Sequence, residues 1–190
     1  MRAQNLALFL ACFSILGANN VAAQQRPPTA TGLWQQIDDA TGKSEGWFLI
    51  YETNGVYEGV IAKTFIKPGE DPNPVCNNCQ GDQRNAPTLG LTFIKHMRRN
   101  GMNYEDGAIL DPRNGNVYNA VMQLSPDNQV LTVRGYLGIS LFGQNRTWHR
   151  LPDSALAQVD RSIIAAHAPA LLPAAARPAN APAPRAPAPR

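Results

Sequence analysis

The sequence predicts an all-β domain, an eight-stranded antiparallel barrel followed by one C-terminal helix. Apolar and polar residues alternate along a series of short segments between residues 31 and 151. Gly, Pro, Asn and Asp cluster between these segments, as they do in turns. Closure into a barrel is favoured because it leaves no unpaired strand edge. An open sandwich is the alternative architecture for the same pattern.

Each predicted strand ends at residues that favour a turn. Asn54-Gly55 is typical of a type I′ hairpin, since both central residues of that turn adopt positive φ. DPRNG (111–115) and SPDN (125–128) place Pro where a turn fixes φ. The predicted strands, in chain order, are residues 31–37, 45–53, 55–65, 89–95, 102–110, 116–124, 129–137 and 144–151.

The hairpin around Asn54-Gly55 is apolar on both faces. Trp47 and Leu49 fall on one face, while Phe48 and Ile50 fall on the other. One face can pack inside the barrel, so the other needs a cover. Residues 153–168 repeat apolar residues at helical spacing, and they are predicted to form an amphipathic helix that docks on the sheet.

The hairpin around SPDN allows a prediction of register. With 125–128 as the loop, Met122 is expected to lie opposite Leu131. Arg134 then falls on the outer face, away from the apolar one. The residues expected to share the buried face are Tyr118, Ala120, Met122, Leu131 and Val133.

The N-terminus resembles an export signal. Arg2 precedes an apolar run over residues 6–17, and small residues then lead to a cleavage position after Ala23, so residues 1–23 are predicted to be a signal peptide. A membrane anchor and a lipidated Cys12 are the alternatives. The mature chain is expected to have no transmembrane segment, to be periplasmic or secreted, and to be monomeric.

The remaining chain divides by composition into a short linker (24–30), the barrel domain (31–152), the amphipathic helix (153–168) and a tail (169–190). The tail is rich in Pro, Ala and Arg, which predicts a disordered segment of extended, polyproline-like character. The chain carries 17 Lys+Arg and 14 Asp+Glu, and three arginines lie in the tail. The domain is therefore close to neutral, which argues against a nucleic-acid partner.

Two short motifs at the ends of the predicted barrel resemble the lipocalin signature. Gly32 and Trp34 stand in GLW, while Arg146, Trp148 and Arg150 stand in NRTWHR. In lipocalins an arginine lies over the tryptophan at the closed end of the barrel. A cation over a tryptophan face stabilises by about 0.5–2 kcal/mol. The resemblance makes Arg146 or Arg150 the candidate partner of Trp34.

A wider set of stretches resembles DUF2147, an exported bacterial family of unknown function. The resemblance implies a small lipocalin-like barrel in the bacterial envelope, and it brings no established activity and no catalytic residues. Besides GLW and TWHR, the stretches are NGVYEG (54–59), NPVCNNCQGD (73–82), PTLG (87–90), EDGAILDPRNGNVY (105–118) and LTVRGYLG (131–138).

Cys76 and Cys79 are the only cysteines beyond the signal peptide. In an oxidising compartment they are expected to form a local disulfide that staples the long connection over 66–88. A redox centre and a metal site are the alternatives. A structural zinc site needs four ligands, and the three histidines are scattered along the chain. No metal and no cofactor are therefore expected, and the long loop is a candidate lid or binding rim.

Few residues suggest chemistry. The sequence has no Gly-x-Ser-x-Gly elbow, phosphate-binding glycine loop or His-Glu-x-x-His motif, so no catalytic residue is assigned. The basic run KHMRRN (95–100) fits a solvated loop at least as well as a binding patch. Asp106 is either an inward ligand anchor or a solvent-facing residue near a turn. The residues that could line an internal cavity, or equally form plain core, are Tyr104, Asp106, Tyr118 and Met122.

The sequence supports two candidate functions. A barrel of this size can hold one small ligand, which predicts a non-enzymatic binding or carrier module for a small apolar or amphipathic molecule. The alternative is an envelope interaction protein with a filled barrel, acting through its loops or its Pro-rich tail. An enzyme is not expected, because the constellations that catalysis needs are absent.

Overall fold

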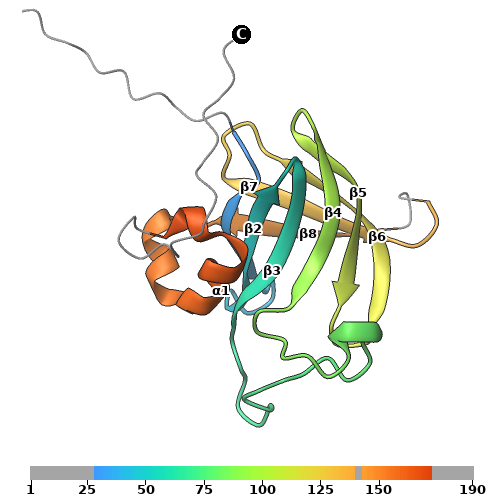
Figure 1. The fold of residues 1–190 in the computed structure, drawn as a ribbon, viewed down its shortest axis with the longest axis vertical. Helices are drawn as coiled ribbons and strands as arrows, with labels where there is room; N and C mark the ends of the chain where they lie inside the picture. Colours follow the sequence, from blue (N-terminus) through green and yellow to red (C-terminus); the bar gives the residue numbers. More distant parts are fainter. Residues whose placement is uncertain (1–27, 140–142, 173–190) are drawn as a thin grey trace, which may run out of the picture.

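The computed structural model describes residues 28–139 and 143–172, and it shows a closed antiparallel barrel. Each strand pairs with the next along the chain, and the eighth pairs with the first (Figure 1). The predicted signal peptide (1–23) lies outside the described residues, as does most of the predicted tail. The strands are β1 (Gly32–Ile37), β2 (Ser44–Thr53), β3 (Val56–Thr64), β4 (Thr92–Asn100), β5 (Asn103–Asp111), β6 (Asn116–Leu124), β7 (Val130–Tyr136) and β8 (Gln144–Arg150).

Strand β4 differs most from its prediction. It was expected over 89–95, and it occupies Thr92–Asn100. The basic run 95–100 is therefore strand and not loop. His96 has φ 65° and forms a bulge, so the in–out alternation of side chains restarts after it. A pattern search that requires strict alternation ends the strand at this bulge.

The β6–β7 register is shifted by two residues from the predicted one. Met122 lies opposite Val133, and Leu124 lies opposite Leu131. The loop is one residue longer than SPDN, since β6 ends at Leu124 and β7 begins at Val130, and Asn128 within it has φ 61°. A shift of two residues preserves the faces of both strands. Ala120, Met122, Leu131 and Val133 are buried as predicted, Tyr118 is half-buried, and Arg134 lies on the outer face.

The two apolar faces of the β2–β3 hairpin are both buried, as predicted. Ile50 belongs to the barrel core, with Phe48 packed against it. Trp47 and Leu49 face outwards and pack with the C-terminal segment, residues 153–172. That segment lies beside β2 (Figure 1). Side chains from that segment complete this outer cluster: Ala155, Val159, Ile163, Ile164, Ala168 and Leu172.

The C-terminal segment covers the sheet as three short pieces and not as the single predicted helix. They are the 3-10 helix η3 (Asp153–Gln158), α1 (Arg161–His167) and the 3-10 helix η4 (Pro169–Leu171). The break falls before α1, where the Asp160 carboxylate accepts a hydrogen bond from the backbone N–H of Ser162 at 2.8 Å. Leu172 is buried, so packed structure continues past residue 168, into the predicted tail.

One end of the barrel is closed by Trp34 and Arg150. The guanidinium carbon of Arg150 lies 4.1 Å from the ring centroid of Trp34. Gly32 has φ 132°, and a Cβ there would lie 2.5 Å from Arg150 Nη1. Arg146 is not the partner of Trp34, because it pairs with Val133 four residues further from this end of β8. Arg150 also donates hydrogen bonds to the backbone carbonyls of Thr29, Thr31 and Asn128.

Residues 28–31 cross this closed end, although the first three were predicted to be linker. Arg99 donates to the Pro28 carbonyl at 2.8 Å, and the Ala30 N–H donates to the Tyr104 hydroxyl at 2.8 Å. Trp34 Nε1 donates to the Ala30 carbonyl at 2.7 Å. The N-terminal segment is therefore fixed to several strands and forms part of the barrel.

We expect Gly32→Ala to lower the free energy of unfolding by about 1–3 kcal/mol, because the methyl group collides with Arg150 at an unfavourable φ. Urea unfolding measures the change. Gly42→Ala is the control: Gly42 has φ 68° with nothing within 4 Å of its Cβ position, so its cost is backbone strain alone, about 1 kcal/mol. Equal losses in both variants would contradict the steric role of Arg150.

Candidate functional site

The barrel interior is filled by its own side chains. Trp34, Met97, Tyr104 and Leu131 have no surface exposed to water, so no water-sized space touches them. Aromatic rings pack against one another here: the half-buried Phe48 lies 4.4 Å from the buried Trp148, centroid to centroid. A ligand inside this region would have to displace packed core residues.

The four residues proposed as cavity lining do not share a cavity. Tyr104 and Met122 are core residues. Asp106 is exposed and has φ 59°, at a bulge in β5 where the pairing with β6 shifts between Tyr104 and Gly107. The bulge turns the carboxylate outwards, so the inward alternative for Asp106 is wrong. Tyr118 is half-buried, and its hydroxyl accepts a long hydrogen bond from Asn116 at 3.5 Å.

A disulfide joins Cys76 to Cys79 in the long connection between β3 and β4. Both cysteines are buried within the barrel core. A Cβ on Gly115, in the β5–β6 turn, would meet the Asn78 carbonyl at 2.1 Å, so the two loops are in close contact. The disulfide loop therefore closes the end of the barrel opposite Trp34 and acts as a lid with a packed inner surface.

We expect the double variant Cys76→Ala/Cys79→Ala to keep the barrel fold and to lose only about 2 kcal/mol of stability. The loss is small because a crosslink that closes a very short loop removes little entropy from the unfolded chain. Urea unfolding with near-ultraviolet circular dichroism measures both quantities. The wild-type protein under a reducing agent is the control for the crosslink alone. Loss of the aromatic circular-dichroism signal in the variant would show instead that the barrel depends on the disulfide.

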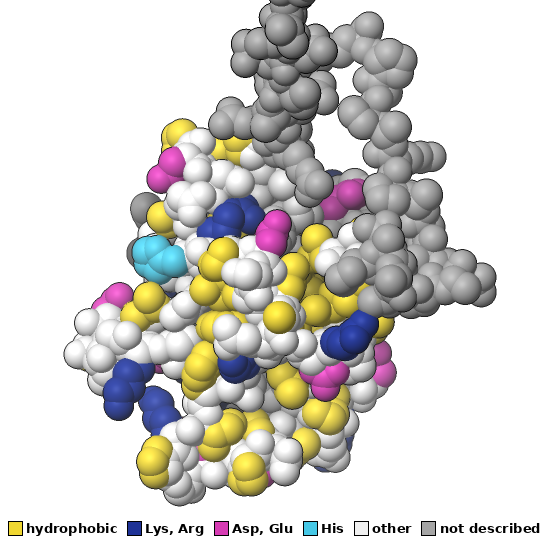
Figure 2. Space-filling view, turned by 90° about the vertical axis from the view of Figure 1, so that its left-hand side faces the viewer, with side chains coloured by type: hydrophobic (Ala, Val, Ile, Leu, Met, Phe, Trp, Pro, Cys, Tyr) yellow, Lys and Arg dark blue, Asp and Glu magenta, His cyan; other side chains and the backbone are white. Residues whose placement is uncertain are grey.

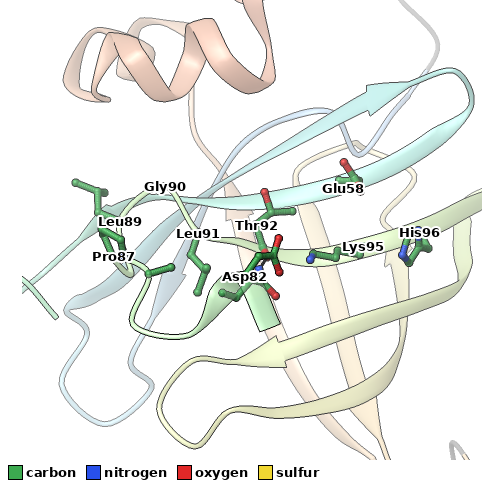
Figure 3. A pocket seen from close by; sticks show the side chains of 11 residues that line it. Glu58, Asp82, Pro87, Leu89, Gly90, Leu91, Thr92, Lys95 and His96 are labelled. Carbon is green, nitrogen blue, oxygen red and sulfur yellow. Dashed lines mark hydrogen bonds between the residues drawn. The ribbon is translucent and has the colours of Figure 1, made fainter. Parts of the chain in front are cut away.

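A groove of about 510 Å³ lies on the outer surface beside this lid. Its ends differ in chemistry (Figure 3): Pro87 and Leu89 lie at one end, and Glu58, Lys95 and His96 lie at the other. The full lining comes from β3, β4 and the loop between them: Glu58, Asp82, Gln83, Ala86, Pro87, Leu89, Gly90, Leu91, Thr92, Lys95 and His96.

The bulge in β4 places two adjacent polar side chains in the groove. Ile94 and Met97 both point into the core, so Lys95 and His96 between them both lie on the outer side. In a regular strand, neighbours point to opposite faces. Sequence reasoning missed this pair for that reason. The available signal was a two-residue polar interruption between two apolar residues of β4.

A chain of contacts connects the polar end of the groove to α1. The Tyr51 hydroxyl donates to Glu58 Oε2 at 3.0 Å, and it lies 3.3 Å from His167 Nδ1. The rings of Tyr51 and His167 pack with centroids 5.3 Å apart. Burial raises the pKa of Tyr51 to about 12, so the hydroxyl stays protonated at neutral pH. Burial lowers the pKa of His167, and the nearby Glu58 carboxylate opposes part of that effect.

The charged groups of the groove are open to a ligand. Among residues 28–139 and 143–172, the one ion pair within 4.0 Å joins Arg113 to Asp111. The half-buried Lys95 is thus in no such pair, and Glu58 has one carboxylate oxygen bound to Tyr51. No group of three or more metal-binding side chains occurs in this part of the chain.

The face that carries the C-terminal segment shows hydrophobic side chains interspersed with polar and charged ones (Figure 2). The apolar residues of that segment point mainly into the outer cluster, which leaves this mixed surface. None of the helices described is both long and apolar enough to cross a membrane.

We expect acidification to loosen α1 through His167. The lowered pKa means that the undocked imidazole takes up a proton first, so docking is fully stable above about pH 6.5 and weakens as the pH falls below it. Hydrogen exchange of the Ile163 and Ile164 amides, corrected for intrinsic rates, measures docking. His167→Phe keeps the ring and should remove this dependence, while His149→Phe, at an exposed position on β8, should retain it. An unchanged pH profile in His167→Phe would contradict the assignment.

The closed barrel, with an arginine over the tryptophan of its first strand, is a lipocalin-like fold. A solved structure, "Protein HP1028 from the human pathogen Helicobacter pylori belongs to the lipocalin family", has a TM-score of 0.59 at 17% identity. The match covers 71% of this chain and 92% of that one. Residues 32–150 match the family described as "Uncharacterized protein conserved in bacteria (DUF2147)", and the chain belongs to that family. No curated protein matches.

Proposed function

We propose that the protein is a non-enzymatic binding protein of the bacterial envelope that holds a small amphipathic ligand in its outer groove. One observation carries this proposal. The groove joins an apolar end, at Pro87 and Leu89, to a charged end with Glu58 and Lys95, while the barrel beside it is filled. Small-molecule sites are concave and combine apolar walls with a few polar groups that fix orientation.

The alternative position for a ligand is the barrel interior, where proteins of this fold can hold one. That position needs one of the two closed ends to open and buried side chains such as Trp148 to move. The outer groove needs neither change. The groove is therefore the better supported site.

The envelope location rests on the predicted signal peptide and on the disulfide. A disulfide persists in an oxidising compartment and is rare in the bacterial cytosol. Cys76 and Cys79 are joined, which supports export. N-terminal sequencing of the mature protein that finds residue 24 first would agree with this location.

We expect decanoate to bind the groove with its carboxylate at Lys95 and its chain over Pro87 and Leu89. Backbone amide shifts recorded by NMR during titration locate the probe, and residues 82–96 should move. Lys95→Gln should weaken binding about fivefold or more, because it removes the paired charge. Lys43→Gln, at an exposed position in the β1–β2 loop, is the matched control and should bind like the wild type.

Two other results would reject this proposal. Shifts concentrated at core residues such as Met122 and Leu131 would place the probe in the barrel and support an internal carrier. No saturable shift with decanoate or with decylamine would favour the second candidate, an envelope interaction protein. The observation that favours that candidate is a set of exposed apolar side chains near the β7–β8 loop: Val117, Leu137 and Ile139, which are 60%, 67% and 61% exposed.

A further inference from the structure

The chain Glu58–Tyr51–His167 connects the groove to a part of the protein that the family match does not include. The match spans residues 32–150, and His167 lies in α1, beyond it. Glu58 lines the groove, and its partner Tyr51 is buried under the C-terminal segment. The carboxylate of a groove residue is therefore bound by a hydroxyl that the C-terminal segment covers.

The proton positions in this chain follow from the partners. A carboxylate can only accept, so the Tyr51 hydroxyl donates its hydrogen bond to Glu58. The hydroxyl oxygen has two lone pairs, so it can accept from the Thr92 side chain and also from His167. Acceptance from His167 places the imidazole proton on Nδ1. In this arrangement His167 fixes Tyr51, and Tyr51 fixes Glu58.

The C-terminal segment also lies close to the elements that carry the groove. A Cβ on Gly90, a lining residue, would lie 3.8 Å from Ile163 of α1. Lys63 of β3 donates to the Gln158 side chain at 3.1 Å, and its ammonium lies 4.3 Å from the Trp47 ring centroid. The segment thus lies against both β3 and the β3–β4 loop.

We propose that the C-terminal segment completes the binding site, and that Tyr51 and His167 are positioning residues that present the Glu58 carboxylate to a cationic head group. This inference rests on the proposed function and adds a ligand preference to it. A carboxylate held by one hydrogen bond keeps its second oxygen for the ligand and loses less rotamer freedom on binding. Without its partners, Glu58 can turn into solvent.

The positioning of Glu58 should affect the binding of a cationic ligand and not that of an anionic one. A primary amine on an apolar chain would place its ammonium at Glu58, whereas a carboxylate on the same chain would place its charge at Lys95. Lys95 belongs to β4 and is not part of the Glu58–Tyr51–His167 chain. Removal of the chain should therefore weaken amine binding selectively. Coupling between two sites is reciprocal, so an amine should in turn protect α1.

Decylamine and decanoate, titrated into the same full-length variants, test the proposal. Tyr51→Phe and His167→Phe keep the packed rings and remove the polar contacts. Both should weaken decylamine binding about fivefold or more and leave decanoate within about twofold. Tyr136→Phe on β7 and His149→Phe on β8 are matched controls on other strands, and both probes should bind them as they bind the wild type.

Two outcomes would overturn the positioning role. An equal loss for both probes would show that the variants damage the groove as a whole, and no loss for decylamine would show that Glu58 needs no positioning. Decylamine should also slow exchange of the Ile164 amide in the wild type and not in His167→Phe.

A readout without ligand separates this inference from the proposed function. The ¹³C shift of the Glu58 carboxyl carbon reports its hydrogen bond, and it should move in Tyr51→Phe and His167→Phe but not in the controls. If the wild type binds neither probe, the proposed function fails, and a moved Glu58 signal still establishes the chain. An unmoved signal would overturn the chain itself, whatever the probes do.

Discussion

The structure depends on a β2–β3 hairpin that is apolar on both faces. Ile50 on one face needs a core inside the barrel, and Leu49 on the other needs a cover outside it. Each buried leucine or isoleucine side chain contributes about 1.5–3 kcal/mol, so neither face can be left in water without large loss. The packed interior buries one face of the hairpin, and the docked C-terminal segment buries the other. The outer groove lies beside the C-terminal segment.

Because side chains fill the interior of the barrel, the candidate site lies on its outer surface. One end is sealed by residues 28–31 and Arg150, and the other is covered by the disulfide loop, whose cysteines belong to the core. The bulge at His96 then sets the outer chemistry, because it places two polar neighbours on the same side of β4. The fold therefore provides a packed body, and the bulge on its surface provides the candidate site.

Much of the fold could be predicted from local pattern. The faces of the β2–β3 hairpin, the need for an outer cover and the joining of two cysteines three residues apart all follow from side-chain period or proximity. The candidate site could not be predicted in the same way. Lys95 and His96 share a side only because of a bulge, and Tyr51 meets His167 across 116 positions of sequence.

The sequence by itself predicted an eight-stranded antiparallel barrel, with an open sandwich as the alternative, and the faces of the β2–β3 and β6–β7 hairpins, because hydrophobic period and turn chemistry act between near neighbours. The resemblance to lipocalins added the candidates for the arginine–tryptophan closure. The tertiary structure alone decided three things: that the interior is full, that Arg150 and not Arg146 covers Trp34, and that Glu58 is tied to the C-terminal segment. These depend on volumes, register and long-range contact. No local pattern encodes them, since a shift of two residues changes every partner and leaves every face the same.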